Sequence, residues 1–184
     1  MDAVITYVDN TDNVWLEEFQ RYQDGSESTF GTNSYRFCTW DNLKYCIRGI
    51  AKFMPFIRKV HLIVSSPTQV PSWINRDEVN IVYHKDIIPE ECLPTFNSRT
   101  IEMCMHNIPD LDEEFVYFND DMFVINMCTP EDFFINGKPN SNLNTYTKEG
   151  LMRKWGRGPI YSKPHLRCNE FPKRILEKMM KFII

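Results

Sequence analysis

The chain of 184 residues is long enough for one sizeable domain with a hydrophobic core. Its 42% hydrophobic and 25% charged residues are typical of a soluble globular protein. Because the formal net charge is −4, the chain has no general attraction to nucleic acid or to an anionic membrane. Any phosphate-bearing partner must therefore be held locally, by a few cations or by a metal.

Six cysteines are scattered along the chain without a Cys-x-x-Cys pair: Cys38, Cys46, Cys92, Cys104, Cys128 and Cys168. This spacing predicts buried, reduced thiols rather than a zinc site or a disulfide framework. The N-terminal sequence "MDAVITYVD" lacks the basic region of a signal peptide, and no segment has the ~20 apolar residues of a membrane span. We expect a cytoplasmic protein without a transmembrane segment, either free or held peripherally at the inner face of the membrane.

The predicted elements alternate between strands and helices. In chain order we expect a strand at 3–8, a helix at 14–22, a polar loop at 23–34, a helix at 41–53, strands at 59–65 and 79–83, a helix from Asn97 or Ser98 to Asn107, a strand at 114–118 and a helical turn at 130–132. Residues 136–162 are rich in Gly and Pro and predict loops, and 173–182 predict an amphipathic helix.

This alternation predicts a single Rossmann-like α/β domain, similar to nucleotide-sugar transferases, with a mostly parallel sheet and helices on both faces. We divide it into a catalytic core at 1–135 and a loop-rich segment with a C-terminal helix at 136–184.

Polar clusters follow three of the four predicted strands. They are Asp9 with Asp12, His84 with Asp86, and Asn119 with Asp120 and Asp121. Because ligands bind beyond the carboxyl ends of the strands in open α/β sheets, we expect the acidic groups to converge on one edge.

The sequence "YFNDDMF" places two adjacent carboxylates, Asp120 and Asp121, between the apolar runs "EFVYF" and "MFVIN". At a separation of ~5 Å and an effective dielectric of ~20, their repulsion is roughly 3 kcal/mol. One interpretation is an exposed hairpin turn, where water screens the charges. The other is a divalent cation, Mg²⁺ or Mn²⁺, which carboxylates at a strand end can hold against a diphosphate. Asp9 has the same two interpretations.

The remaining candidates each have a structural alternative. Arg48 is either a solvated or salt-bridged arginine or a clamp for a phosphate. Asn97 and Ser98 either cap a helix or offer backbone N–H groups to an anion. His165 is either a solvated loop residue or a general base near pH 7. Among the other histidines, we expect a structural role for His61 and leave His84 and His106 open.

Long stretches of the chain resemble the Stealth family of sugar-phosphate transferases, which includes bacterial capsule polysaccharide phosphotransferases and the catalytic subunit of the lysosomal-enzyme GlcNAc-1-phosphotransferase. Residues 2–12, "DAVITYVDNTD", are similar to the first family block, with Tyr7 for Trp and Asn10 for Gly. The second block is similar to "DNLKYCIRGIAKFMPFIRKVHLIV", "VPSWIN", "VNIVYHKDIIP", "LPTFNSRTIEMCMHNIPDLDEEFVYFNDDMF" and "TPEDFF". The third block is matched weakly by "SKPHLRCNEFPKRILEKM", which contains His165, and the fourth is not found, so we expect a chain truncated at its C-terminus.

The resemblance implies transfer of a sugar-1-phosphate from a nucleotide-diphosphate sugar to an acceptor sugar hydroxyl, in capsule or exopolysaccharide synthesis. It implies Asp9, Asp120 and Asp121 as metal and diphosphate ligands, with Mg²⁺ or Mn²⁺ as the metal. It also implies Arg48 as the cation on the transferring phosphate, His165 as the base, and a substrate pocket shaped by Asn97, Ser98 and Asn119. Two alternatives stay open, namely a conventional nucleotide-sugar glycosyltransferase and an inactive fragment or donor-binding subunit.

Overall fold

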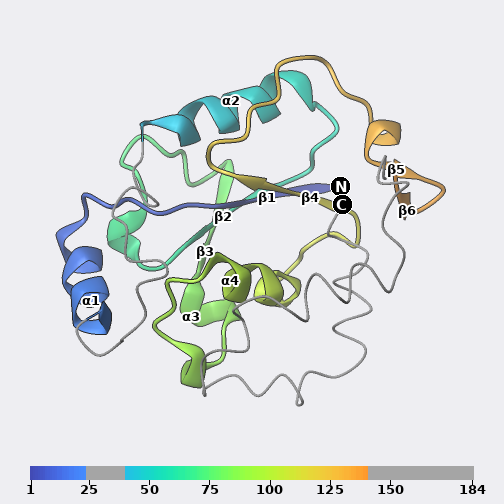
Figure 1. The fold of residues 1–184 in the computed structure, drawn as a ribbon. Helices are drawn as coiled ribbons and strands as arrows, with labels where there is room; N and C mark the ends of the chain where they lie inside the picture. The colour runs from blue at the N-terminus through green and yellow to red at the C-terminus, as the bar shows by residue number, and fades with distance from the viewer. Residues whose placement is uncertain (24–39, 141–184) are drawn as a thin grey trace.

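The structure, a computed structural model, describes residues 1–23 and 40–140 (Figure 1). Most of the predicted polar loop at 23–34, the predicted helix at 173–182 and His165 lie outside the described residues. The division at 135–136 stays a prediction for the same reason.

Four parallel strands form the central sheet in the order β3-β2-β1-β4. They are β1 (Asp2–Thr6), β2 (Val60–Val64), β3 (Val79–Tyr83) and β4 (Phe115–Asn119). All four predicted strands are confirmed, but β1 ends at Thr6 rather than at residue 8. The backbone N–H of Tyr7 still donates to the carbonyl of Ile63 at 3.0 Å, and the chain then turns where Gln69 holds the backbone of Asp9.

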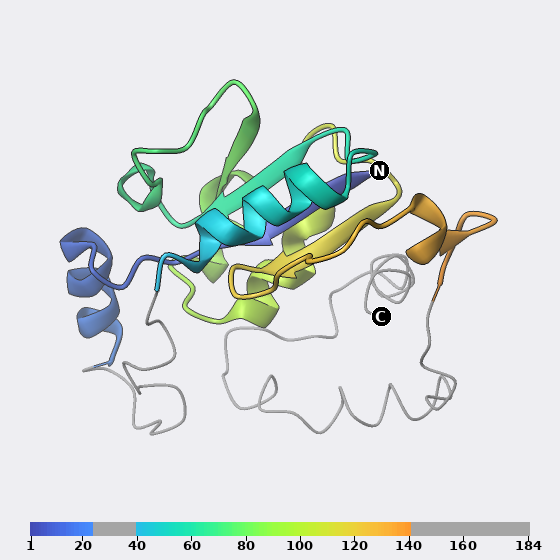
Figure 2. The same ribbon diagram turned by 90° about the horizontal axis from the view of Figure 1, so that it is seen from above.

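Helices cover both faces of this sheet, as predicted (Figures 1 and 2). Helix α2 (Asn42–Phe53) lies on one face, and α3 (His84–Ile87) and α4 (Ser98–Cys104) lie on the other. Side chains alternate along the strands, so each face has its own core. The core under α2 includes Ala3, Ile5, Leu43, Ile50, Leu62 and Phe118, and the core on the other face includes Val4, Ile63, Val82, Cys104, Met105 and Phe115.

The remaining elements lie outside these layers or are short. Helix α1 (Asn13–Gln23) follows β1 beyond the carboxyl edge of the sheet. The helix predicted to reach Asn107 ends at Cys104 and continues as a 3-10 turn, η4 (Met105–Asn107). Further 3-10 turns are η2 (Pro67–Gln69), η3 (Glu90–Cys92) and η5 (Pro130–Asp132). Two-residue strands β5 (Phe134–Ile135) and β6 (Lys138–Pro139) pair in a separate antiparallel hairpin.

None of the described helices is both long and apolar enough to cross a membrane. The four described cysteines are free thiols, of which Cys46 and Cys104 are buried.

Residues 119–122 form the expected turn, in which the Met122 N–H donates to the Asn119 carbonyl at 3.1 Å and Asp121 is exposed, but the turn does not join a hairpin. Strand β4 pairs in parallel with β1, and the next strand of the described chain, β5, belongs to the other sheet. The apolar run after Asp121 is also not a buried strand, because four of its side chains are exposed: Met122, Phe123, Ile125 and Met127.

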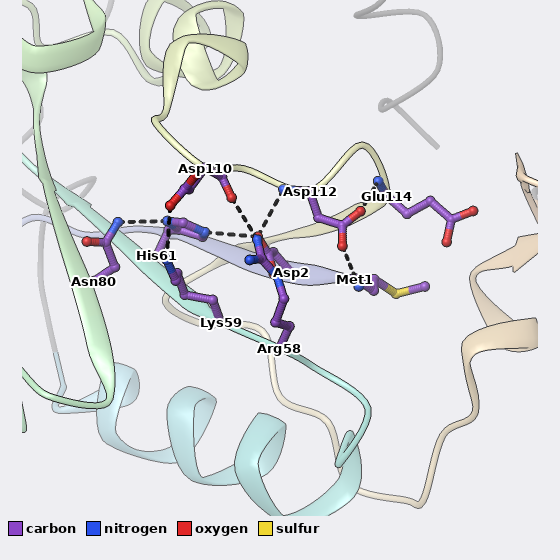
Figure 3. Close-up of polar contacts among 9 residues, drawn as sticks. All are labelled: Met1, Asp2, Arg58, Lys59, His61, Asn80, Asp110, Asp112 and Glu114. Atoms are coloured by element: carbon purple, nitrogen blue, oxygen red, sulfur yellow. Dashed lines mark hydrogen bonds and ion pairs between the residues drawn. The ribbon is translucent and has the colours of Figure 1, made fainter.

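A buried ionic network joins the amino ends of the strands (Figure 3). The fully buried Asp2 carboxylate accepts hydrogen bonds from Arg58 Nε at 3.0 Å and Nη2 at 2.8 Å, from the Asp112 backbone N–H at 3.0 Å, and from His61 Nε2 at 3.1 Å. Asn80 Nδ2 donates to His61 Nδ1 at 2.9 Å, which makes Nε2 the protonated nitrogen of a neutral imidazole.

The pKa values agree with this assignment. Burial raises the pKa of Asp2, but hydrogen bonds from Arg58, Asp112 and His61 outweigh it and leave that pKa below its usual value. Burial lowers the pKa of His61, although Asp2 opposes the shift. The structural role predicted for His61 is confirmed. Sequence analysis missed Asp2 because its partners lie 56, 59 and 110 residues away.

We predict that Asp2→Ala lowers the free energy of unfolding by ~3–5 kcal/mol, the usual cost of removing one partner of a buried ionic network. The substitution leaves the buried His61 imidazole and the N–H of Asp112 without their acceptor. Urea denaturation at neutral pH measures the change. Glu113→Ala is the matched control, because Glu113 is an exposed carboxylate next to Asp112 in the loop before β4. It should change the free energy of unfolding by less than ~0.5 kcal/mol. Equal effects of the two substitutions would contradict the role given to Asp2.

Candidate functional site at the carboxyl edge of the sheet

The candidate site lies at the opposite end of the sheet, where β1 and β4 end side by side. Thr6 and Asn119, the last residues of these strands, are partners in the parallel register. The segments that carry Asp9 and Asp120 therefore leave the sheet at the same edge, as expected for a ligand site in an α/β fold.

Asp120 and Asp121 follow β4 and lie beside α2. The Cys46 thiol of α2 is 3.9 Å from the carbonyl oxygen of Asn119, and its pKa is raised to about 12 by burial and by the charges of Asp120 and Asp121. Burial and the charge of Asp121 also raise the pKa of Asp120. No Lys, Arg or His within 1–23 or 40–140 forms an ion pair with either carboxylate. The pair is thus a local excess of negative charge that a bound cation would relieve.

A hydrogen-bonded chain orients Asn119. The Tyr117 hydroxyl lies 2.6 Å from Asn119 Oδ1, 3.0 Å from Thr6 Oγ1 and 3.5 Å from Glu102 Oε1. The hydroxyl has one proton, and the shortest contact assigns it to Asn119. Asn119 Oδ1 is then occupied, and its exposed side chain is left with two N–H donors for a ligand.

Helix α4 brings Glu102 to the same chain of contacts. Burial raises the pKa of Glu102, although Tyr117, Arg99 and Ser98 oppose the shift. Burial also raises the pKa of Tyr117 to about 12, so its hydroxyl stays protonated at neutral pH. Sequence analysis did not select Glu102. Its position four residues after Ser98, on the same side of a helix, is the signal that could have identified it.

Asn97 and Ser98 begin α4. Asn97 Oδ1 accepts a hydrogen bond from the backbone N–H of Arg99 at 3.1 Å, so Asn97 is an ordinary N-cap. Ser98 lies one helical turn before Glu102 and opposes the rise in the pKa of that carboxyl group. The role of Ser98 as a substrate-binding residue stays a prediction, and the Asn97 side chain is already used in the cap.

The carboxylates of Asp9 and Asp12 already accept hydrogen bonds within the turn after β1. Asp9 Oδ1 accepts from the backbone N–H of Thr11 at 2.8 Å and from its hydroxyl at 2.6 Å. Buried Gln69 bonds to the Asp9 backbone and to Asp12, which also caps α1 and accepts from Thr68. In the described part of the chain, no three His, Cys, Asp or Glu side chains are arranged to hold a metal ion. The role of Asp9 as a ligand stays a prediction.

The cluster after β3 does not join the site, because β2 separates β3 from β1. His84 is buried, and burial lowers its pKa to about 4. The Asp86 carboxylate accepts from the backbone N–H of Tyr83 at 3.1 Å and caps α3. His106 Nδ1 lies 2.9 Å from the carbonyl oxygen of Met103, near the C-terminal end of α4, and is a hydrogen-bond partner for it. These polar groups stabilise local structure.

Arg48 lies on the exposed side of α2. It forms part of the wall of an open groove of about 550 Å³ between α2 and residues 123–125. The two walls can approach closely because residue 49 is glycine, where an added Cβ would lie 2.7 Å from the carbonyl oxygen of Val124.

The match to a known family identifies the class of protein. Residues 36–141, more than half of the chain, match the model of the family described as Stealth protein CR2, conserved region 2. The chain belongs to the Stealth family. The matched region contains Arg48, Asn97, Ser98, Glu102 and the stretch 119–121.

Three relatives show how far the similarity extends. The capsular polysaccharide phosphotransferase of Actinobacillus suis is 34% identical over 97% of this chain and 48% of its own length. The capsular polysaccharide phosphotransferase WcwK of Streptococcus pneumoniae is 43% identical over 86% of this chain and 48% of its own length. The exopolysaccharide phosphotransferase cps2G of Lactiplantibacillus plantarum is 41% identical over 73% of this chain and 39% of its own length. The chain thus spans half or less of the length of these relatives.

We predict that the Tyr117–Asn119 hydrogen bond couples the two side chains energetically. A double-mutant cycle with Tyr117→Phe and Asn119→Ala, measured by urea denaturation, should give a coupling free energy of ~1 kcal/mol. The matched control pairs Tyr22→Phe, on α1, with the same Asn119→Ala change and should be additive. Additivity in both cycles would mean that Tyr117 does not orient Asn119.

Proposed function

We propose that the protein transfers a sugar-1-phosphate from a nucleotide-diphosphate sugar to a hydroxyl of a growing capsular or extracellular polysaccharide. The acceptor oxygen attacks the phosphorus that carries the sugar, a phosphodiester forms, and the bond to the nucleoside monophosphate breaks. The names of the three relatives support the transferase class, and the donor is our inference. We place the reaction in the cytoplasm, with no nucleic acid partner.

The carboxylate pair at the end of β4 carries this proposal. Asp120 has a raised pKa, Asp121 is exposed beside it, and neither has a cationic partner among the described residues. Mg²⁺ is commonly held by one or two carboxylates together with substrate phosphates and water, so two carboxylates suffice. When bound, such an ion neutralises charge on the diphosphate. We assign Asp120 and Asp121 to hold Mg²⁺ or Mn²⁺, with Asp9 as a further candidate from β1.

The remaining polar groups suit a phosphate and a sugar. Arg48 is exposed and its planar guanidinium can make paired charge-assisted bonds, so we assign it to the transferring phosphate. Asn119 offers its two N–H donors to the donor substrate. Ser98 and Asn97 shape the adjacent part of the pocket at the start of α4.

Two groups are candidates for the base that removes the acceptor proton. His165 precedes a predicted helix in the sequence, and histidine is a common general base near neutral pH. Glu102 is supported by the structure, because it lies next to Tyr117 and its raised pKa makes it a stronger base than an exposed glutamate.

The released nucleotide tests the reaction. Incubating the purified protein with a panel of nucleotide sugars and an oligosaccharide acceptor should release a nucleoside monophosphate in a Mg²⁺- or Mn²⁺-dependent manner. Asp121→Asn should abolish this metal-dependent release, whereas Asp110→Asn, at an exposed carboxylate near the opposite edge, should not. Release of a nucleoside diphosphate would identify a conventional glycosyltransferase. Donor binding without turnover would identify a donor-binding subunit.

A further inference from the structure

Large apolar side chains are exposed on one surface beside α2. Four of them follow the carboxylate pair in one short segment, and their exposed fractions are high: Met122 46%, Phe123 47%, Ile125 74% and Met127 65%. Tyr45 on α2 is 60% exposed. The segment runs along α2, as Figure 2 shows, and is held there by the Gly49–Val124 contact and by a hydrogen bond from the Cys128 N–H to the Phe53 carbonyl. Large apolar side chains that gather on one exposed segment are a feature of protein or membrane contact sites.

The same surface is cationic. Helix α2 carries Lys44, Arg48 and Lys52 at intervals of four residues, which aligns them along one side of the helix, and it contains no Asp or Glu. Lys44 pairs with Asp41, just before the helix, at 3.3 Å. Arg48 and Lys52 are exposed and form no ion pair among the described residues. Asp41 and the pair Asp120 and Asp121 lie at the border of this row, so the positive charge is confined to the exposed side of α2 itself.

The groove between α2 and the segment indicates what covers it. Between the cations Arg48 and Lys52, its lining is mainly apolar, from Tyr45, Phe53, Phe123 and Ile125. A bound glycan would need hydrogen-bond partners for its many hydroxyl groups, and this lining offers few. Anionic phospholipids match both properties, because their acyl chains accept apolar side chains and their phosphates attract Lys and Arg.

We propose that the α2 surface, defined as Lys44, Tyr45, Lys52 and the exposed side chains of 122–127, docks the protein on an anionic phospholipid bilayer, and that Arg48 stays with the donor phosphate. The apolar side chains enter the interface and the cations meet the phosphate groups. Met122 directly follows Asp121, so docking holds the carboxylate pair close to the membrane surface. The proposal does not depend on the transfer reaction, because docking needs neither nucleotide sugar nor divalent ion.

Vesicle flotation without nucleotide or divalent ion tests the proposal. The protein should float with vesicles of equal parts phosphatidylcholine and phosphatidylglycerol, should not float with phosphatidylcholine alone, and should be released by high salt. Lys52→Gln should lower the partition coefficient about fivefold, the effect of one cation near an anionic surface. Ile125→Ser should lower it about tenfold through lost apolar burial.

The matched controls lie elsewhere on the protein. Lys85→Gln removes an exposed cation from α3, on the opposite face of the sheet, and Val14→Ser removes a 58% exposed apolar side chain from α1. Both should partition like the wild type. Failure of the wild type to float, or equal flotation of all four variants, would overturn the proposal. The proposal would also be overturned if the wild type bound phosphorylated dextran but not vesicles, and if the Lys52 and Ile125 variants lost that binding to dextran. A fall in melting temperature confined to Ile125→Ser would show instead that other parts of the protein cover this side chain.

Discussion

The buried carboxylate of Asp2 is the interaction on which the rest of the fold depends. Removing a charge from water is costly unless it is paired and fully hydrogen bonded. Asp2 meets that condition by drawing donors from the segment before β2, from β2 itself and from the loop before β4. His61 extends the network to Asn80 on β3. One side chain thereby holds the amino ends of all four strands in a single arrangement, and the parallel register then sets Thr6 beside Asn119 at the far edge.

The two ends of the sheet use the same residue type in opposite ways. Asp2 has a lowered pKa because hydrogen-bond donors outweigh its burial, and it is satisfied within the protein. Asp120 has a raised pKa because it is partly buried next to another carboxylate. Structural carboxylates are expected to resemble Asp2, whereas a carboxylate that awaits a cation is expected to resemble Asp120. The exposed Asn119 and Asp121 side chains beside Asp120 agree with that distinction.

Local patterns predicted much of the fold and part of the site. Short β-branched runs and helical spacing identified the four strands and α2, and the polar stretch at 119–121 identified one end of the site. Asp2 and Tyr117 could not be selected in this way, because their roles depend on partners that approach only when the sheet forms. Glu102 has a local signal, its position one helical turn after Ser98, but its contact with Tyr117 also forms only in the fold. The exposure of the apolar side chains at 122–127 could not be read from their composition for a related reason, since hydrophobic residues are buried only where a neighbouring element covers them. The exposure of these side chains is the observation on which the proposed membrane surface is based.

We propose that the carboxyl edge of the sheet binds a divalent ion, whereas the amino edge is structural. Paramagnetic broadening of backbone amide signals by Mn²⁺ tests it directly, in the presence of a nucleoside diphosphate. The account predicts selective loss of signals from residues 119–122 and from the turn after β1, with those of Asp2, His61 and Asp112 retained. Broadening centred on the acidic residues 110–114 near the amino edge, or no selective broadening, would contradict it.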